Sequence, residues 1–121
     1  HEICHGLPDE RILEEGEVVG IDIGLRLKGF CGDACVTYPV GQVAPHVERL
    51  LAIGRAALHR GIEAAQYNNH LHDIGRAIQD YADTQGVSVV HEWGGHGIGR
   101  ILHENMSVSH IRQSTPGPPA R

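Results

Sequence analysis

The sequence has little of three features that would assign it to a class at once: cysteine, clustered positive charge and long apolar runs. Its three cysteines have no framework spacing, which predicts free thiols in a reducing compartment. The formal net charge of -5, with no Lys/Arg cluster, argues against a nucleic-acid partner. With no membrane-length apolar run and no signal-peptide pattern, we expect a cytoplasmic protein without a membrane partner.

The length and composition indicate one small globular unit. A chain of 121 residues suffices for one core but not for two ordinary domains. Hydrophobic residues make up 40% and charged residues 21%, which excludes a disordered or fibrous protein. Ten histidines are many for this length. Five of them are expected to be solvated on surface helices or loops: His46, His59, His70, His72 and His110.

A β-hairpin is predicted near the start of the chain. Alternating apolar residues over 19–27 predict a strand, and a second strand over 30–38 follows a two-residue turn. Pairing across that turn places apolar residues or glycine on one face, which we expect to be core. The other face carries Asp22 and Asp33 as diagonal neighbours, roughly 7–8 Å apart at the backbone. Such carboxylates either share a cation or are two unrelated side chains on a solvated face.

The rest of the chain predicts two helices and one more strand. Apolar stripes favour one helix from about Pro45 to Gly61 and a second over 72–84. A short apolar run over 87–91 predicts a strand, and the chain beyond Glu104 is expected to be loop. The order of these elements predicts an α+β fold, with helices backing one face of an antiparallel sheet and a site on the other.

The segment 94–104 places His96 and His103 among four glycines. Imidazole binds metals and carries protons at neutral pH, and glycines allow a ligand to come close. For His96 we favour a metal ligand over a histidine that caps a turn. Cys31 and Cys35 face the same side as the aspartates, but their spacing favours free thiols over a closed zinc site.

Together these pieces resemble the type I methionine aminopeptidases of peptidase family M24, which have the pita-bread, or creatinase-like, fold. The matching segments, in family order and spacing, are Cys4-His5-Gly6-Leu7-Pro8-Asp9, Gly20-Ile21-Asp22-Ile23-Gly24, Gly32-Asp33 with Thr37-Tyr38-Pro39-Val40-Gly41, and Gly95-His96-Gly97-Ile98-Gly99-Arg100 with His103-Glu104. The resemblance implies that residues 1–121 form a partial catalytic domain, incomplete at both ends. They would contain the N-terminal half of the α+β pita-bread fold and the start of its second half.

The resemblance also implies an activity: metal-dependent removal of the initiator methionine from nascent polypeptides. Asp22 and His96 would be metal ligands, and Asp33 would bridge two divalent ions of Co, Mn, Fe or Zn. These ions would create a nucleophile at neutral pH and polarise the substrate carbonyl. The substrates would be nascent chains beginning with Met, met at the ribosome, and the full-length protein would be a monomer.

Two further histidines match family positions that contact the substrate rather than the metal. By the resemblance, His5 and His103 are catalytic groups that hydrogen-bond the scissile amide and the tetrahedral intermediate. Leu102 corresponds to a position that lines the methionine side-chain pocket, and an ordinary core leucine is the alternative.

The chain departs from the family pattern after the second histidine. The family's metal centre needs two glutamates further along, and the last acidic residue here is Glu104. We therefore expect a fragment with negligible peptidase activity by itself. Two alternatives stay open for the whole protein: a relative of prolidase or aminopeptidase P, and a non-catalytic pita-bread binding module.

Overall fold

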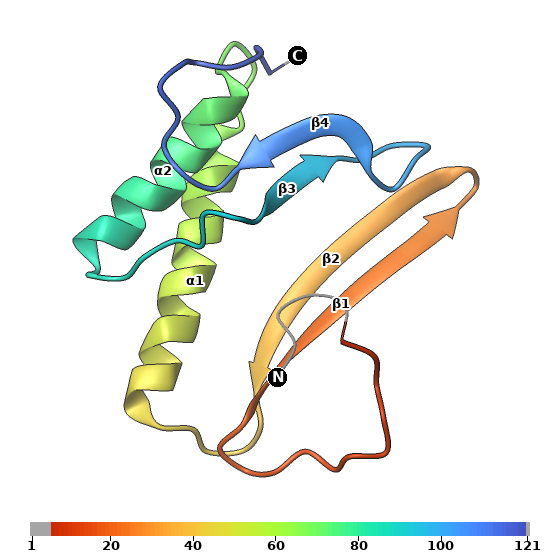
Figure 1. Ribbon diagram of the computed structural model, residues 1–121, viewed down its shortest axis with the longest axis vertical. Coiled ribbons are helices and arrows are strands. Elements are labelled where there is room, and N and C mark those ends of the chain that lie inside the picture. Colours follow the sequence, from red (N-terminus) through yellow and green to blue (C-terminus); the bar gives the residue numbers. More distant parts are fainter. Residues whose placement is uncertain (1–5, 121) are drawn as a thin grey trace.

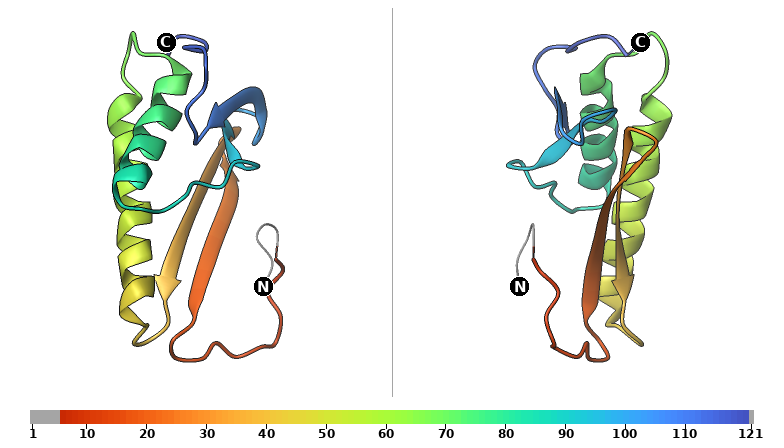
Figure 2. Two further views of the ribbon diagram at one scale, coloured as in Figure 1. Left: turned by 60° about the vertical axis from the view of Figure 1, so that its left-hand side comes forward. Right: turned by 90° about the vertical axis from the view of Figure 1, so that its right-hand side faces the viewer.

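The computed structural model describes residues 6–120, which form two β-hairpins and a pair of helices (Figure 1). In chain order the elements are β1 (Val18–Leu27), β2 (Phe30–Pro39), α1 (Pro45–Ala64), α2 (Leu71–Thr84), β3 (Gly94–Gly97) and β4 (Glu104–Ser109). Strands β1 and β2 form one antiparallel sheet, and β3 and β4 form another. Helix α1 packs along α2, and α2 contacts β4 (Figure 2). No helix among the described residues is long and apolar enough to cross a bilayer.

The first hairpin has the predicted register. Leu27 pairs with Phe30 across the turn, and further along the ladder Gly24 pairs with Asp33. The two turn residues, Lys28 and Gly29, have φ angles of 51° and 84°. Positive φ at both positions is the type I′ geometry, whose twist matches that of the flanking strands. The predicted placement of the aspartates on one face is therefore confirmed.

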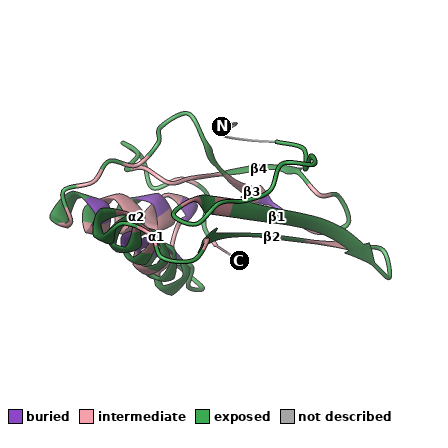
Figure 3. Ribbon diagram, turned by 90° about the horizontal axis from the view of Figure 1, so that it is seen from below, coloured by how far each residue is buried: buried purple, intermediate pink, exposed green. Residues whose placement is uncertain are grey.

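The apolar face of this hairpin is not core, so that expectation was wrong. Ile23, Leu25 and Leu27 are exposed, as the colouring of β1 in Figure 3 shows. The main packing contacts of the helices are with each other and with β4, so they do not back the β1–β2 sheet. An amphipathic strand pattern predicts which face is apolar, but not whether another element covers it.

The core lies between the two helices. Four apolar residues of α1 and α2 are buried: Ile53, Ala57, Leu71 and Ala82. The prediction that α1 stops near Gly61 was wrong, because Gly61 is a packing position inside the helix. A side chain there would place its Cβ 2.9 Å from Ile78 Cδ1 on α2, so glycine allows the helices to approach closely. The predicted start at Pro45 is confirmed.

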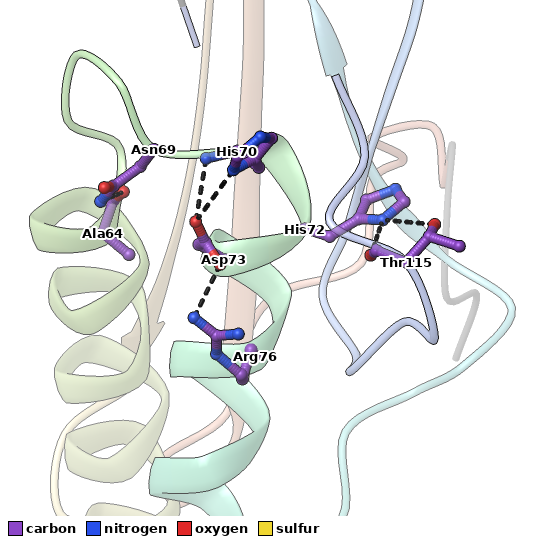
Figure 4. Close-up of polar contacts among 7 residues, drawn as sticks. All are labelled: Ala64, Asn69, His70, His72, Asp73, Arg76 and Thr115. Atoms are coloured by element: carbon purple, nitrogen blue, oxygen red, sulfur yellow. Dashed lines mark hydrogen bonds and ion pairs between the residues drawn. The ribbon is translucent and has the colours of Figure 1, made fainter. Parts of the chain in front are cut away.

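A set of polar contacts determines where α2 begins (Figure 4). The backbone N–H of His70 donates to Asp73 Oδ2 at 2.9 Å, and Arg76 donates to Asp73 Oδ1 at 2.7 Å. An acidic residue in the first turn also suits the positive end of the helix dipole. His72 is not simply solvated as expected, since its Nδ1 lies 2.7 Å from the carbonyl oxygen of Thr115. This contact ties the C-terminal segment to α2.

The strands of the second half differ from the prediction. Residues 87–91 are not a strand, because Val87 and Val89 line an apolar groove between α1 and α2 instead of pairing with another strand. His110 lines the same groove, and this half-burial corrects its assignment as a solvated side chain.

The strands themselves begin later, at β3 and β4. The alternation of Met106 and Val108 was a strand signal that the loop prediction overlooked. A Cβ on Gly94 would lie 2.7 Å from the carbonyl oxygen of Val108, so glycine is needed for this pairing. Glycines weaken a strand by propensity, which is why β3 was hard to predict.

Candidate metal centre

Asp33 on β2 and His96 on β3 lie in contact with each other, where the two hairpins meet. Their closest atoms, Asp33 Oδ2 and His96 Nε2, are 3.4 Å apart. The two side chains are 27% and 28% exposed, so they are partly shielded from water. The ring of His103 lies next to that of His96, with centroids 4.3 Å apart and planes inclined by 53°. Three predicted site residues, separated by up to 70 positions in the chain, therefore meet.

The ring nitrogen of His96 that faces Asp33 is Nε2. The contact made by the other ring nitrogen, Nδ1, determines whether Nε2 of the neutral ring carries a lone pair. Nδ1 lies 3.0 Å from the carbonyl oxygen of Gly97. A carbonyl only accepts hydrogen bonds, so Nδ1 carries a proton and donates it. Nε2 of the neutral ring then presents a lone pair to a carboxylate oxygen. Two acceptors at this distance need a proton or a metal cation between them. A carbonyl on the other ring nitrogen is also how proteins commonly orient a metal-binding histidine.

Asp22 is on the same face of the hairpin, where it pairs with Cys35. It does not complete a metal-binding group: across residues 6–120, no three His, Cys, Asp or Glu side chains are close enough to hold an ion together. The described residues thus provide a carboxylate–imidazole pair, with Asp22 on the neighbouring strand, two residues from the partner of Asp33. The predicted catalytic residue His5 lies outside the described residues.

Leu102 packs onto the hairpin directly beside the aspartate. Its Cδ2 lies 3.7 Å from the position that a Cβ of Gly24 would occupy, and Gly24 is the partner of Asp33 in the ladder. A Cβ at Gly24 would thus be in ordinary van der Waals contact with Leu102, which places the leucine directly against β1. The leucine is half-buried at the margin of the site. This position is compatible with a pocket wall and with a packing role.

The segment before Leu102 is attached to the hairpin by contacts that sequence reasoning missed. The backbone N–H of Cys31 donates to the carbonyl of Gly99 at 2.7 Å. Arg26 donates to the carbonyl of Arg100 at 2.5 Å, and the Arg100 guanidinium lies 4.5 Å from the ring centroid of Phe30. Strand alternation places Arg26 on the face of the aspartates, but no sequence pattern indicates its partner 74 residues later.

With this geometry established, comparison with known proteins identifies the family. The model of metallopeptidase family M24 matches residues 1–119. The chain belongs to this family. Methionine aminopeptidase 1 of Bacillus subtilis is 38% identical over 117 residues, which are 97% of this M24 chain and 47% of the relative. The methionine aminopeptidase of Rickettsia prowazekii is 39% identical over 97% of the chain and 45% of its own length. The chain thus spans about half the length of the curated relatives it matches.

Solved structures confirm the fold. The crystal structure of methionine aminopeptidase from Rickettsia prowazekii matches with a TM-score of 0.93 and 38% identity, over 98% of this chain and 48% of that one. The prolidase from Pyrococcus furiosus matches with a TM-score of 0.80 and 23% identity, over 93% of this chain and 34% of that one. The second match shows shared fold alone. The α+β pita-bread fold predicted from the sequence is therefore confirmed, and this chain contains part of it.

Proposed function

We propose that the whole protein containing this chain is a metal-dependent aminopeptidase that removes N-terminal methionine from polypeptides. The observation that carries the proposal is the Asp33–His96 pair, two side chains suited to metal binding that meet from separate sheets in an M24 chain. The relatives with substantial identity support the substrate class, since those described above are methionine aminopeptidases. Membership of a metallopeptidase family supports a divalent metal in the reaction.

The donor chemistry of the pair fits a divalent ion. A carboxylate oxygen of Asp33 and a ring nitrogen of His96 lie 3.4 Å apart, close enough for both to be ligands of one divalent ion. Carboxylate oxygen with a single imidazole suits Mn, Fe, Co or Zn. We propose that Asp22, Asp33 and His96 contribute ligands to two such ions in the whole protein. When bound, they supply Lewis acidity toward the substrate carbonyl and lower the pKa of water.

The other proposed roles belong to the side chains around the pair. His103, whose ring adjoins that of His96, is placed to hydrogen-bond the reacting amide, and His5 would do the same from the N-terminal segment. Leu102, at the margin of the site, would contact the methionine side chain. The substrates would be nascent chains in the cytoplasm at the ribosome, and the whole protein would act as a monomer.

Two other functions compete with this proposal. The similarity to prolidases is at the level of fold, with 23% identity against 38% for methionine aminopeptidases, and this difference favours the latter. A non-catalytic binding module is opposed by the presence of Asp22, Asp33 and His96 in one chain. Metal stoichiometry of the purified whole protein separates the aminopeptidase from a binding module, because a binding module would retain no divalent ion.

The main experiment compares variants of the complete gene product in methionine release from a Met-Ala-Ser peptide with added Mn²⁺ or Co²⁺. Asp33→Asn and His96→Ala should each lower metal affinity and activity at least about a hundredfold. His59→Ala, on the exposed side of α1, serves as the matched histidine control and should match the wild type. Full activity of Asp33→Asn, or activity without metal, would overturn the proposal.

A second assay uses the 121 residues alone. Because the described residues bring together a pair of ligands and not a three-ligand group, we expect weak metal binding and negligible methionine release. Clear methionine release by these residues with added metal would contradict this expectation. It would show that the ligands within the chain suffice.

A further inference from the structure

The segment that carries Leu102 and His103 connects β3 to β4 and lies against the tip of the β1–β2 hairpin (Figure 1). The two sheets are not joined by strand pairing. No backbone ladder therefore determines how far His103 stands from Asp33. That distance depends on a few individual contacts between the segment and the hairpin.

Arg26 makes one of the side-chain contacts that connect the segment to the hairpin. It lies on the face of the β1–β2 sheet that carries the aspartates, and its Nη2 donates to the carbonyl oxygen of Arg100 at 2.5 Å. A charged donor at this distance forms a stronger bond than a neutral one. The carbonyl belongs to the residue two positions before Leu102, so the bond acts close to both proposed substrate contacts.

Neighbouring contacts hold the same residue from other directions. The guanidinium of Arg100 lies over the Phe30 ring at 4.5 Å, and the preceding carbonyl, of Gly99, accepts from Cys31 at 2.7 Å. Leu102 then packs over Gly24. The segment is thus attached at the hairpin tip and rests on the strand beside Asp33, with Arg26 between these two points.

We propose that Arg26 is a positioning residue: its bond to the Arg100 carbonyl holds His103 beside the His96–Asp33 pair. Among the described residues Arg26 forms no hydrogen bond or ion pair with Asp33, His96 or His103, so it acts through the backbone of the segment. The consequence for catalysis rests on the proposed function, because it requires His103 to contact the substrate. The position of His103 relative to the His96–Asp33 pair does not depend on the proposed function.

The first test measures geometry by NMR of the histidine side chains in the complete gene product. Arg26→Met keeps the aliphatic stem and removes the donor, so the imidazole signals of His96 and His103 should shift while that of His59 stays. Arg26→Lys retains a charged donor and should restore part of the wild-type spectrum. Arg49→Met is the matched control, since Arg49 likewise donates to a backbone carbonyl, that of Gln85 at 2.7 Å. It should leave His96 and His103 unchanged.

The second test measures kinetics on the same variants with the Met-Ala-Ser peptide and Mn²⁺. Misplacing a catalytic group lowers turnover more than binding, so Arg26→Met should reduce kcat about tenfold or more with a smaller change in KM. Arg26→Lys should recover most of this loss. Arg49→Met should have wild-type kcat.

Two NMR results would overturn the positioning role: unmoved His96 and His103 signals in Arg26→Met, or shifts that include His59 and so report general loosening. A wild-type protein without peptidase activity would instead refute the proposed function, while the NMR comparison still tests the role of Arg26. An active wild type with an equally active Arg26→Met variant would refute positioning alone.

Discussion

The β1–β2 hairpin and the α1–α2 pair are both amphipathic, but only the helices bury their apolar side chains. Ile53 on α1 is 5% exposed, whereas Ile23 on β1 is 55% exposed. The helices cover each other, and their short loop and small residues, such as Gly61, allow close contact. The hairpin's apolar face has no comparable cover among residues 6–120.

The residues that stabilise the fold and the residues proposed for catalysis therefore lie in different regions of the chain. The helical pair holds the core residues, and the hairpin holds the two aspartates that the proposed function needs. Burial of apolar area contributes about 25 cal/mol per Å², so an exposed face contributes little to stability. Substitutions on the hairpin should therefore affect the site more than stability, and substitutions in the helices the reverse.

The largest expected contrast comes from the same truncation in both regions. Ile53→Ala should lower the free energy of unfolding by about 2–4 kcal/mol, because it leaves a cavity in the core. Ile23→Ala should lower it by less than about 1 kcal/mol, because the side chain is already half in water. Urea denaturation of the two variants measures both values. Equal losses would show that the hairpin face is covered in solution.

A second contrast uses glycines of the helical pair. A Cβ at Gly75 would lie 2.5 Å from the carbonyl oxygens of Ser109 and Ile111, so Gly75→Ala should force α2 away from β4. We expect a loss of about 1–3 kcal/mol. Gly54→Ala, where no atom lies within 4 Å of the new Cβ, should instead be neutral or stabilising. If both variants unfold at the same urea concentration, the α2–β4 contact is looser than described.

A smaller effect concerns pH and again belongs to the helical region. Burial in the apolar groove lowers the pKa of His110 below the ordinary value of 6.5. The unfolded chain therefore takes up this proton first as pH falls. Stability is complete above about pH 6.5 and decreases from there down to the lowered folded pKa. His110→Leu should flatten this part of a plot of thermal midpoint against pH, while His59→Leu should not. An unchanged slope in His110→Leu would exclude His110 as the source.

The smallest expected effect involves a surface ion-pair cluster that joins α2 to the segment after β4. Arg112 donates to Asp80 at 2.6 Å and to Asp83 at 2.9 Å, and these carboxylates raise the pKa of its guanidinium. Arg112→Gln should lower the thermal midpoint slightly at low salt, and the difference should vanish in 1 M NaCl because exposed pairs are screened. A loss that persists at high salt would indicate packing by the arginine stem instead.

Much of the fold was predictable because its signals are local. The period of two over 19–27 and the turn glycine predicted the first hairpin with its register, and the helical stripes predicted α1 and α2 to within a few residues. The strand predicted over 87–91 was wrong because an apolar run does not reveal whether a helix pair or a strand will cover it. Strand β3 was not predicted, because its glycines are explained by the close approach of Val108. That approach is a long-range contact, which a local sequence pattern does not indicate.

For the candidate site, sequence by itself determined the chemistry of the side chains and the strand face of each aspartate. Alternation along a strand and hairpin register are local rules, so Asp22 and Asp33 follow from them. Only the tertiary structure decided that His96 meets Asp33, that Arg26 reaches the Arg100 carbonyl, and that the hairpin's apolar face is left in water. Each of these three features depends on contacts, or on missing contacts, between segments far apart in the chain. Local sequence patterns do not determine such contacts, because they result from the packing of the whole molecule.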